Sequence, residues 1–261
     1  MPHIGSSFVI LKQVDSTNNY AMAKVHAGLA KHGNAWFSSL QTAGKGQRGK
    51  AWLTGEGQNI ALSTILNPKQ LNITHPFQLL VAVALASFDF FSSYAGDETR
   101  IKWPNDIYWR DRKAGGVLIE NKFSGADWKW AVVGIGVNIN QAKFDPAIIN
   151  PVSLIQITGK NFDPVQLAKE LHQLILKRAD ELLTKSYEVL LGEYNSHLYK
   201  IHEAVRLKRG IGVFETIIRG VSAQGKLLTE DAMEKEFDFG EVEWVVASLP
   251  SKGGFSEDSD L

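Results

Sequence analysis

A glycine-rich stretch at residues 41–52 constrains this chain more than any other feature. Glycine permits positive φ and close approach of the backbone to a ligand, and cations between glycines can reach a phosphate or a carboxylate. A tryptophan closes the stretch with a flat face suited to stacking. The residues concerned are Gln41, Gly44, Lys45, Gly46, Gln47, Arg48, Gly49, Lys50 and Trp52. The pattern favours a loop that closes over a charged, nucleotide-like ligand, and a mobile hairpin tip is the alternative.

Two phosphate-binding motifs match this stretch on spacing alone. The glycines fit the G-x-G-x-x-G dinucleotide fingerprint, and together with Lys50 they approach a P-loop. Both motifs need a helix that begins at the glycines, whereas residues 52–57 carry two more glycines and no helical period. Ala51 also stands where a P-loop needs Ser or Thr. We therefore interpret both matches as accidental.

Composition describes an ordinary globular chain. Its 261 residues suit one large domain, or a large domain plus a small one. Hydrophobic residues make up 44% and charged residues 21%, and zero net charge gives no overall field for nucleic acid or an anionic membrane. The absence of cysteine excludes disulfides, thiolate metal sites and a cysteine nucleophile. No pairing of His with acidic residues has metalloenzyme spacing.

We expect a cytoplasmic protein with no membrane segment. No apolar run approaches the roughly 18 residues that span a bilayer. Residues 1–15 show no basic segment followed by an apolar one, so no signal peptide is predicted.

Hydrophobic periodicity predicts an alternation of strands and helices. Expected strands lie at 8–11, 35–40, 59–66, 114–120 and 128–139, and expected helices follow 15–18 and cover 76–91, 164–185 and 186–198. Residues 77–91 are so apolar that we expect a buried helix there. Residues 15–18 are Asp-Ser-Thr-Asn, the residue types that cap helices. The amides and hydroxyls at such a helix start can also hold a small polar group such as a urea or a carboxylate.

Two further stretches carry polar groups inside strand-like runs. In residues 100–109 the expected strand is interrupted by Pro104, so it must bulge or lie at an edge. Lys102, Asn105 and Asp106 sit at this break; a hairpin with solvated charges is the alternative. Near 134–138, glycines inside a strand indicate close approach of backbone or ligand. Asn138 either satisfies backbone groups there or lines a pocket floor.

The hydrophobic pattern of the sequence changes near residue 201. Short alternating segments separated by glycines predict a small β domain at 201–250 that packs on a main domain at 1–200. Residues 251–261 have the composition of a frayed polar tail.

Taken together, these stretches resemble the biotin–protein ligase family. The resemblance rests on residues 15–18, 41–52, 102–106, 112–116 and 134–138, in the family's order and spacing, and covers nearly the whole chain. It implies an α+β fold: a mixed β-sheet flanked by helices, like a class II synthetase core, with a small C-terminal SH3-like β-barrel. It also implies a form without the N-terminal DNA-binding domain that some members carry.

The resemblance implies a two-step reaction. Biotin is adenylated with Mg-ATP, and the biotinyl group is then transferred to a lysine of a biotin carboxyl carrier domain of a carboxylase. Biotin and ATP are thus the substrates and Mg²⁺ accompanies ATP, with no metal site on the protein. No DNA and no membrane are expected as partners, and a homodimer is possible in this family.

The resemblance also implies roles for individual residues. The catalytic set is Lys113, Arg48, Lys102 and Asp106. The biotin-binding set is Ser16, Thr17, Asn18, Gln41, Gly44, Lys45, Gly46, Gln47, Lys113, Gly115, Gly116 and Gly134. The adenylate-binding set is Arg48, Lys50, Trp52, Lys102, Asn105 and Asn138. For Lys102, support of the adenylate charge and a structural pairing with Asp106 are both open.

One departure from the family pattern concerns Gln47, where many members have an arginine that helps to retain the adenylate. We expect this loop to hold the intermediate less tightly. A lipoate or octanoate ligase or transferase shares the core fold and is the nearest alternative, but such enzymes lack the 44–49 loop and the 102–106 motif together. A nucleic-acid-binding module is a further alternative, and zero net charge weighs against it.

Overall fold

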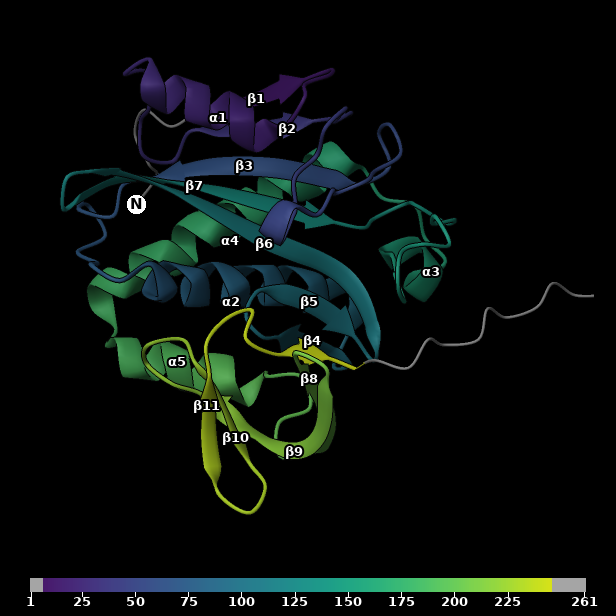
Figure 1. Ribbon diagram of the computed structural model, residues 1–261. Helices are drawn as coiled ribbons and strands as arrows, with labels where there is room; N and C mark the ends of the chain where they lie inside the picture. The colour runs from purple at the N-terminus through teal and green to yellow at the C-terminus, as the bar shows by residue number, and fades with distance from the viewer. Residues whose placement is uncertain (1–6, 246–261) are drawn as a thin grey trace, which may run out of the picture.

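The molecule is built around a seven-stranded sheet. The structure is a computed structural model that describes residues 7–245, and Figure 1 shows how its helices and strands are arranged. The strand order is β1-β2-β3-β7-β6-β5-β4. Neighbouring strands are antiparallel except β1 and β2, which run parallel. The strands are β1 (Phe8–Leu11), β2 (Ala35–Ser38), β3 (Ile60–Leu66), β4 (Thr99–Lys102), β5 (Asp106–Trp109), β6 (Arg112–Ser124) and β7 (Asp127–Val137).

Helices cover both faces of this sheet. α1 (Thr17–His26) packs on β2, β3 and β7 from one side, and α2 (Pro76–Ala95) and α4 (Pro164–Thr184) pack on the other. Two shorter helices, α3 (Leu154–Thr158) and α5 (Tyr187–Ser196), pack against α2. The predicted mixed sheet flanked by helices is confirmed.

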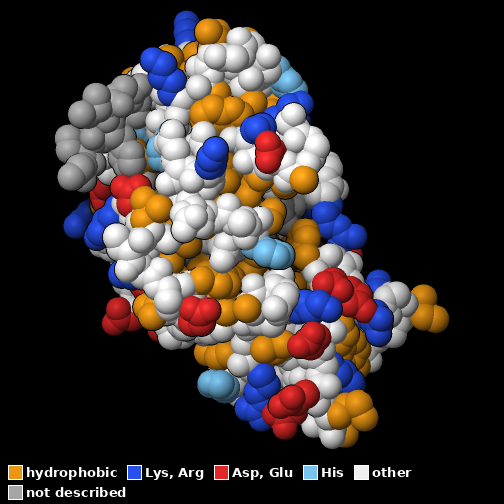
Figure 2. All heavy atoms as spheres, turned by 90° about the vertical axis from the view of Figure 1, so that its left-hand side faces the viewer, with side chains coloured by type: hydrophobic (Ala, Val, Ile, Leu, Met, Phe, Trp, Pro, Cys, Tyr) orange, Lys and Arg blue, Asp and Glu red, His pale blue; other side chains and the backbone are white. Residues whose placement is uncertain are grey.

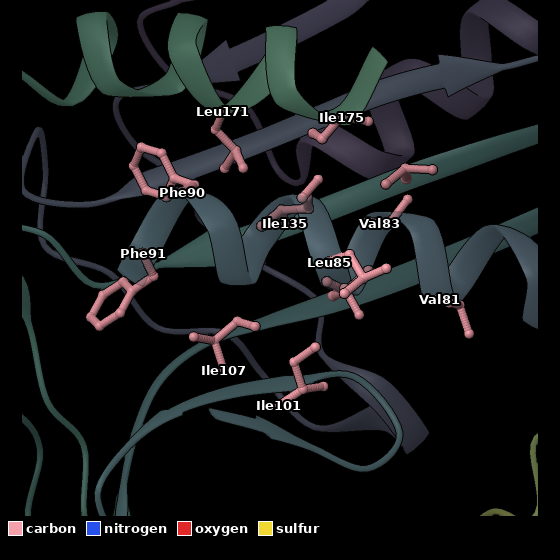
Figure 3. Packing of buried hydrophobic residues seen from close by; sticks show 14 of the residues in the cluster. Val81, Val83, Leu85, Phe90, Phe91, Ile101, Ile107, Ile135, Leu171 and Ile175 are labelled. Atoms are coloured by element: carbon pink, nitrogen blue, oxygen red, sulfur yellow. The ribbon is translucent and has the colours of Figure 1, made fainter. Parts of the chain in front are cut away.

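The alternating side chains of the strands place different residues on the two faces of the seven-stranded sheet. Ile60 and Leu62 of β3 belong to the main core with α2 and α4, whereas Ile65 belongs to a smaller cluster under α1. Figure 3 shows how Leu171 and Ile175 of α4 lie over α2 in the main core. Because successive side chains of a strand point to opposite faces, the residues between these core positions form the floor of the α1 side.

The apolar helix at 76–95 corrects one prediction from the sequence. By length and composition α2 is the one helix in the described part of the chain that could cross a membrane, although we had expected no such run. Its position explains the composition, because Leu79, Val83, Leu85 and Phe90 are fully buried between the sheet and α4. An interior helix is apolar all round for this reason.

The segment around Pro104 also differs from prediction. We expected one strand interrupted at the proline, whereas β4 and β5 are two antiparallel strands, with Lys102 paired to Asp106. Residues 103–105 form the turn between them, and the Trp103–Pro104 peptide bond is cis. The hairpin lies at the sheet edge, so the missing proline N–H removes no ladder bond.

The C-terminal part forms a second, five-stranded antiparallel sheet in the order β11-β10-β9-β8-β12. Its strands are β8 (Ala204–Arg209), β9 (Gly212–Val221), β10 (Leu227–Glu230), β11 (Glu234–Phe237) and β12 (Glu243–Trp244). The described strands form an open sheet, so a closed SH3-like barrel is not confirmed. Leu207, Ile218 and Phe237 join the main core, and the predicted tail at 251–261 lies outside the described residues.

The surface is electrostatically mixed. On the face drawn in Figure 2, Lys and Arg side chains alternate with Asp and Glu over the described residues, and no continuous basic stripe crosses it. This distribution agrees with the zero net charge of the chain.

A buried arginine ties three helices together. Arg178 of α4 bonds Asp89 of α2 at 2.6 Å, Glu193 of α5 at 2.6 Å and Glu181 of its own helix at 2.9 Å. The Arg178 side chain is only 10% exposed, so its charge depends on these carboxylates.

We predict that Arg178→Ala lowers the free energy of unfolding by about 3–5 kcal/mol, because it leaves three carboxylates facing one another without their cation. Arg219→Ala, which breaks an exposed pair with Glu230, is the control and should cost less than about 1 kcal/mol. Urea denaturation measures both. Equal, small losses would show that the three-helix junction does not depend on this arginine.

Candidate active site

A cavity of about 920 Å³ lies on the α1 side of the sheet. It is bounded by the start of α1, the glycine-rich loop at 41–52, strands β5 to β7, the loop at 144–151 and residues 239–244 of the C-terminal part. All predicted site residues line it except Gly44 and Gly115: Ser16, Thr17, Asn18, Gln41, Lys45, Gly46, Gln47, Arg48, Lys50, Trp52, Lys102, Asn105, Asp106, Lys113, Gly116, Gly134 and Asn138. Five separate stretches of sequence that carry predicted site residues thus meet in one place.

Glycines on the sheet make the room for this cavity. A Cβ at Gly134 would stand 2.2 Å from Asn18 Oδ1, and a Cβ at Gly136 would stand 2.3 Å from the Trp52 ring. The Asn18 amide and the Trp52 indole therefore lie directly on the backbone of β7. Any larger residue at either position would push its partner off the sheet.

The two predicted glycines that do not line the cavity, Gly44 and Gly115, support its wall from behind. A Cβ at Gly44 would stand 2.3 Å from the Trp52 carbonyl oxygen, and one at Gly115 would stand 2.8 Å from the Gly136 carbonyl oxygen. Both glycines allow close backbone packing behind the cavity wall.

The start of α1 faces the cavity and does not cap itself. Ser16 is the N-cap residue, but its side chain makes no capping bond, so the expected capping role is wrong for this hydroxyl. The Thr17 amide instead donates to Gln41 Oε1 at 2.8 Å, and Asn18 Nδ2 donates to Glu120 Oε2 at 2.8 Å. Ser16, Thr17 and Asn18 are nonetheless buried, which makes this a built polar pocket.

Lys113 and Asp106 form the charged centre of the cavity. Lys113 Nζ lies 2.7 Å from Asp106 Oδ2, and both side chains remain partly open to the cavity. Their strands pair with a register shift: Asp106 faces Gly116, whereas Tyr108 faces Lys113, so Ala114 is an extra residue. This β-bulge brings Lys113 to the same face as Gly116.

Lys102 sits in an aromatic surround. Its Nζ bonds the Tyr108 hydroxyl at 3.0 Å and lies 4.5 Å from the Tyr108 ring centre, 5.3 Å from that of Trp244 and 6.0 Å from that of Tyr199. Asp106 forms its ion pair with Lys113. The ion pair between Lys102 and Asp106 that the sequence left open is therefore not the one observed. Burial lowers the pKa of Lys102 to about 8, and the charge of Lys113 acts in the same direction, whereas Asp106 opposes it.

The glycine-rich loop folds over the cavity with a single 3₁₀ turn at Gln47–Gly49. Arg48 has a left-handed φ of 55°, and its guanidinium lies 3.5 Å from the Gly240 carbonyl oxygen of the C-terminal part. Gln47 Nε2 donates to the Val117 carbonyl oxygen at 3.3 Å. One turn of helix does not make the anion site of a P-loop, in agreement with the sequence.

The two asparagines of the adenylate set bond backbone groups. Asn138 Nδ2 donates to the Val152 carbonyl oxygen at 3.0 Å, and Asn105 Nδ2 donates to that of Val117. Both residues also line the cavity. Asn138 therefore does both things considered from the sequence: it satisfies a backbone group and it lines the pocket. Their side-chain nitrogens are committed to the protein.

Several cavity residues were missed by sequence reasoning. Tyr108 and Trp244 surround Lys102, Gly240 meets Arg48, and the loop at 144–151 supplies apolar walls. Ser63, fully buried behind the cavity, was missed as well, although a serine in the apolar run of β3 is a local signal. The C-terminal residues gave no such signal, because only tertiary packing brings them here.

A polar cavity floored by glycines and rimmed by lysines and an arginine suits a small ligand that carries polar and anionic groups. A family model described as the biotin/lipoate A/B protein ligase family matches residues 10–138. The bifunctional ligase/repressor BirA of Escherichia coli is 31% identical, over 91% of this chain and 74% of that protein. The biotin–[acetyl-CoA-carboxylase] ligase of Paracoccus denitrificans is 30% identical, over 84% of this chain and 92% of that protein.

Solved structures agree with these relatives. The biotin protein ligase from Aquifex aeolicus in complex with biotin and ATP superposes with a TM-score of 0.77 and 28% identity, covering 92% of this chain and 99% of that one. The chain belongs to the biotin/lipoate A/B protein ligase family, and within it to the biotin protein ligases.

We predict that Lys102 titrates with a pKa of about 8 in the free protein, well below the ordinary 10.5, because burial disfavours its charged form. NMR of protein labelled at the lysine side chains should show one Cε resonance that titrates near this value and is absent from Lys102→Arg. Its absence from the wild-type spectrum, with every lysine titrating near the ordinary value, would contradict the buried position of Lys102.

Proposed function

We propose that the cavity carries out both steps of an ATP-dependent biotin protein ligase, with Lys113 at its chemical centre. The observation that carries this proposal is the convergence of Lys113, Asp106, Arg48 and Lys102 on one glycine-floored cavity. Biotin and ATP are the substrates, and biotinyl-AMP is the intermediate. The product is a biotinylated lysine on a carrier domain, with AMP and pyrophosphate released.

The first step brings two anions together. The biotin carboxylate attacks the α-phosphorus of ATP, forming a mixed anhydride and displacing pyrophosphate. The repulsion must be offset by preorganised positive charge at the contact. Lys113 reaches into the cavity with Asp106 as its present partner, so its ammonium is held in place before substrates arrive. In this role it bridges the carboxylate and the α-phosphate oxygens.

Other residues hold the two ends of the intermediate. Ser16, Thr17, Asn18 and Gln41 bind the ureido ring, and Trp52 stacks on adenine, a contact worth roughly 1–3 kcal/mol by analogy with bases on aromatic residues. Asn105 and Asn138 shape the nucleotide end through the backbone that they hold.

The loop then shields the product. Lys45, Arg48 and Lys50 close over the adenylate, and excluding water protects an anhydride that would otherwise hydrolyse. Mg²⁺ enters the site together with ATP, whose polyphosphate it accompanies.

The second step needs a neutral amine. Deprotonating a lysine of pKa about 10.4 at pH 7 costs about 4.6 kcal/mol. Asp106 orients the incoming ammonium by accepting a hydrogen bond from it. The proton passes on to water as the neutral amine attacks the carbonyl carbon of the anhydride, and AMP leaves as the C–O bond to the phosphate breaks. The acceptor is the carrier domain of a biotin-dependent carboxylase, in keeping with the names of the relatives.

The same proposal covers the organisation of the chain. The proposed catalytic domain is 1–200 and the proposed small SH3-like domain is 201–250, of which residues 1–6 and 246–250 lie outside the described part of the chain. Within the described part, Gly240 and Trp244 line one side of the cavity. A homodimer, if formed, would use an edge of the seven-stranded sheet, and sedimentation of the purified chain tests it.

We predict that Lys113→Ala lowers the rate of biotin-dependent ATP–pyrophosphate exchange by about 100- to 1,000-fold, the usual cost of removing one preorganised charge-stabilising group. Lys129→Ala, which removes a half-exposed lysine paired with Asp127, is the matched control and should leave the rate unchanged. Exchange driven by lipoate and not by biotin would show that the assigned substrate is wrong. An exchange rate of Lys113→Ala equal to that of the wild type would contradict the proposed mechanism.

We predict that the wild-type protein releases biotinyl-AMP when no acceptor is present, and that Gln47→Arg slows this release by about tenfold. A new charged hydrogen bond to the phosphate supplies the difference. Rapid filtration with labelled biotin measures the release. Negligible loss from the wild type would show that Gln47 does not weaken the loop.

A further inference from the structure

A chain of hydrogen bonds runs behind the end of the cavity that α1 closes. Asn18 lies at its centre: its Nδ2 donates to Glu120 Oε2 at 2.8 Å, and its Oδ1 lies 2.6 Å from Ser63 Oγ. Ser63 Oγ lies 2.8 Å from Thr17 Oγ1. The Thr17 amide donates to Gln41 Oε1 at 2.8 Å. The chain therefore connects Glu120, outside the cavity wall, to Gln41 inside it.

Three strands of the sheet fix the position of the Asn18 side-chain amide. Ser63 on β3, Gly134 on β7 and Leu118 on β6 are paired neighbours across three strands. The amide lies over Gly134, where a Cβ would stand 2.2 Å from Oδ1, and Nδ2 also lies 3.4 Å from the Leu118 carbonyl oxygen. Asn18 is 3% exposed and Ser63 is fully buried.

The carboxylate sets the direction of the bonds in this chain. Glu120 only accepts, so Asn18 must turn its NH₂ toward Glu120 and its oxygen toward Ser63. Asn18 Oδ1 carries no hydrogen, so the Ser63 hydroxyl donates to it. The Thr17 hydroxyl then donates to Ser63 Oγ at 2.8 Å or to Gln41 Oε1 at 3.1 Å. In either arrangement its proton is used within the protein, and Thr17 Oγ1 offers a lone pair to the cavity.

Gln41 is held by Thr17, whose amide donates to Gln41 Oε1 at 2.8 Å and whose hydroxyl lies 3.1 Å from the same oxygen. Because its Oε1 accepts from the Thr17 amide, its NH₂ group is left to donate into the cavity that it lines. An acceptor at Thr17 beside a donor at Gln41 matches the N–H and C=O groups of a cyclic urea.

We propose that Ser63 and Glu120 are the positioning residues that orient this donor and acceptor pair for the ureido ring of biotin. The proposal rests on the proposed function, since the ring is that of the substrate. Neither residue lines the cavity within the described part of the chain, so both act through Asn18 and Thr17. Glu120 also meets Lys45 at 3.5 Å, but both side chains are about a third or more exposed, and such a pair contributes little.

The test uses Glu120→Leu, Ser63→Ala and the double variant in the full chain. Each single variant should raise the Kd for biotin, by calorimetry, and the KM for biotin in pyrophosphate exchange by about tenfold or more. The kcat at saturating biotin and the KM for ATP should stay within about twofold of wild type. The double variant should lose less than the product of the single losses, because both residues act on one chain of bonds.

Two further variants separate positioning from general stability. Glu120→Gln keeps an oxygen that can accept from Asn18 and should recover most of the affinity. Glu230→Leu removes a glutamate of the exposed pair with Arg219 and should leave biotin binding unchanged. If Ser63→Ala lowers the Tm, Glu120→Leu carries the test alone, since that side chain is 32% exposed.

Wild-type protein that binds biotin, with Glu120→Leu binding it equally well, would overturn the positioning role. A parallel fall in kcat, biotin affinity, ATP affinity and Tm would overturn it too, because it would show a structural role only. Wild-type protein that fails to bind biotin would instead overturn the proposed function.

Discussion

The contact between Lys113 and Asp106 depends on one extra residue in β6. Without the bulge at Ala114, Lys113 would share a face with Gly115 and Val117, and Val117 is buried in the main apolar core. A shift of one residue moves a side chain to the opposite face of a sheet. The bulge therefore turns an ammonium that would otherwise point into an apolar core toward the cavity, 2.7 Å from a carboxylate. The first step of the proposed reaction uses that ammonium.

The cavity also requires that the sheet carry glycines, which have no side chain, on the side that faces it. Gly116, Gly134 and Gly136 lie on the cavity side of β6 and β7, and the space that they leave is filled by Asp106, Asn18 and Trp52. The remaining space is lined by hydrogen-bonding groups from the start of α1 and by cations from the glycine-rich loop, β4 and β6. Such a lining suits a ligand that carries a neutral polar ring and an anionic group, as biotin does.

Much of this could be predicted from local sequence, and the rest could not. The helix at 164–185 and the strand at 59–66 follow from periodicity within one segment. Gly134 stands out as a glycine inside a strand, whereas Lys113 was singled out only through the family resemblance. The hairpin at Pro104 was mistaken for one strand, because the polar residues Lys102, Asn105 and Asp106 at the break were interpreted as a distortion within a strand and not as a turn between two strands. Trp244 could not be connected with Lys102 from sequence, since the two lie 142 positions apart (244 − 102) and meet only through packing. Ser63 was treated as an ordinary strand residue because its partners, Thr17 and Asn18, come from another element.

The most direct test of this account is a crystal structure with biotin and an ATP analogue whose α–β bridge is a methylene group, so that the reactants stay apart. We predict that Lys113 Nζ lies within about 3 Å of both a biotin carboxylate oxygen and an α-phosphate oxygen. A complex in which both ligands occupy the cavity but Lys113 remains on Asp106 and touches neither would contradict it.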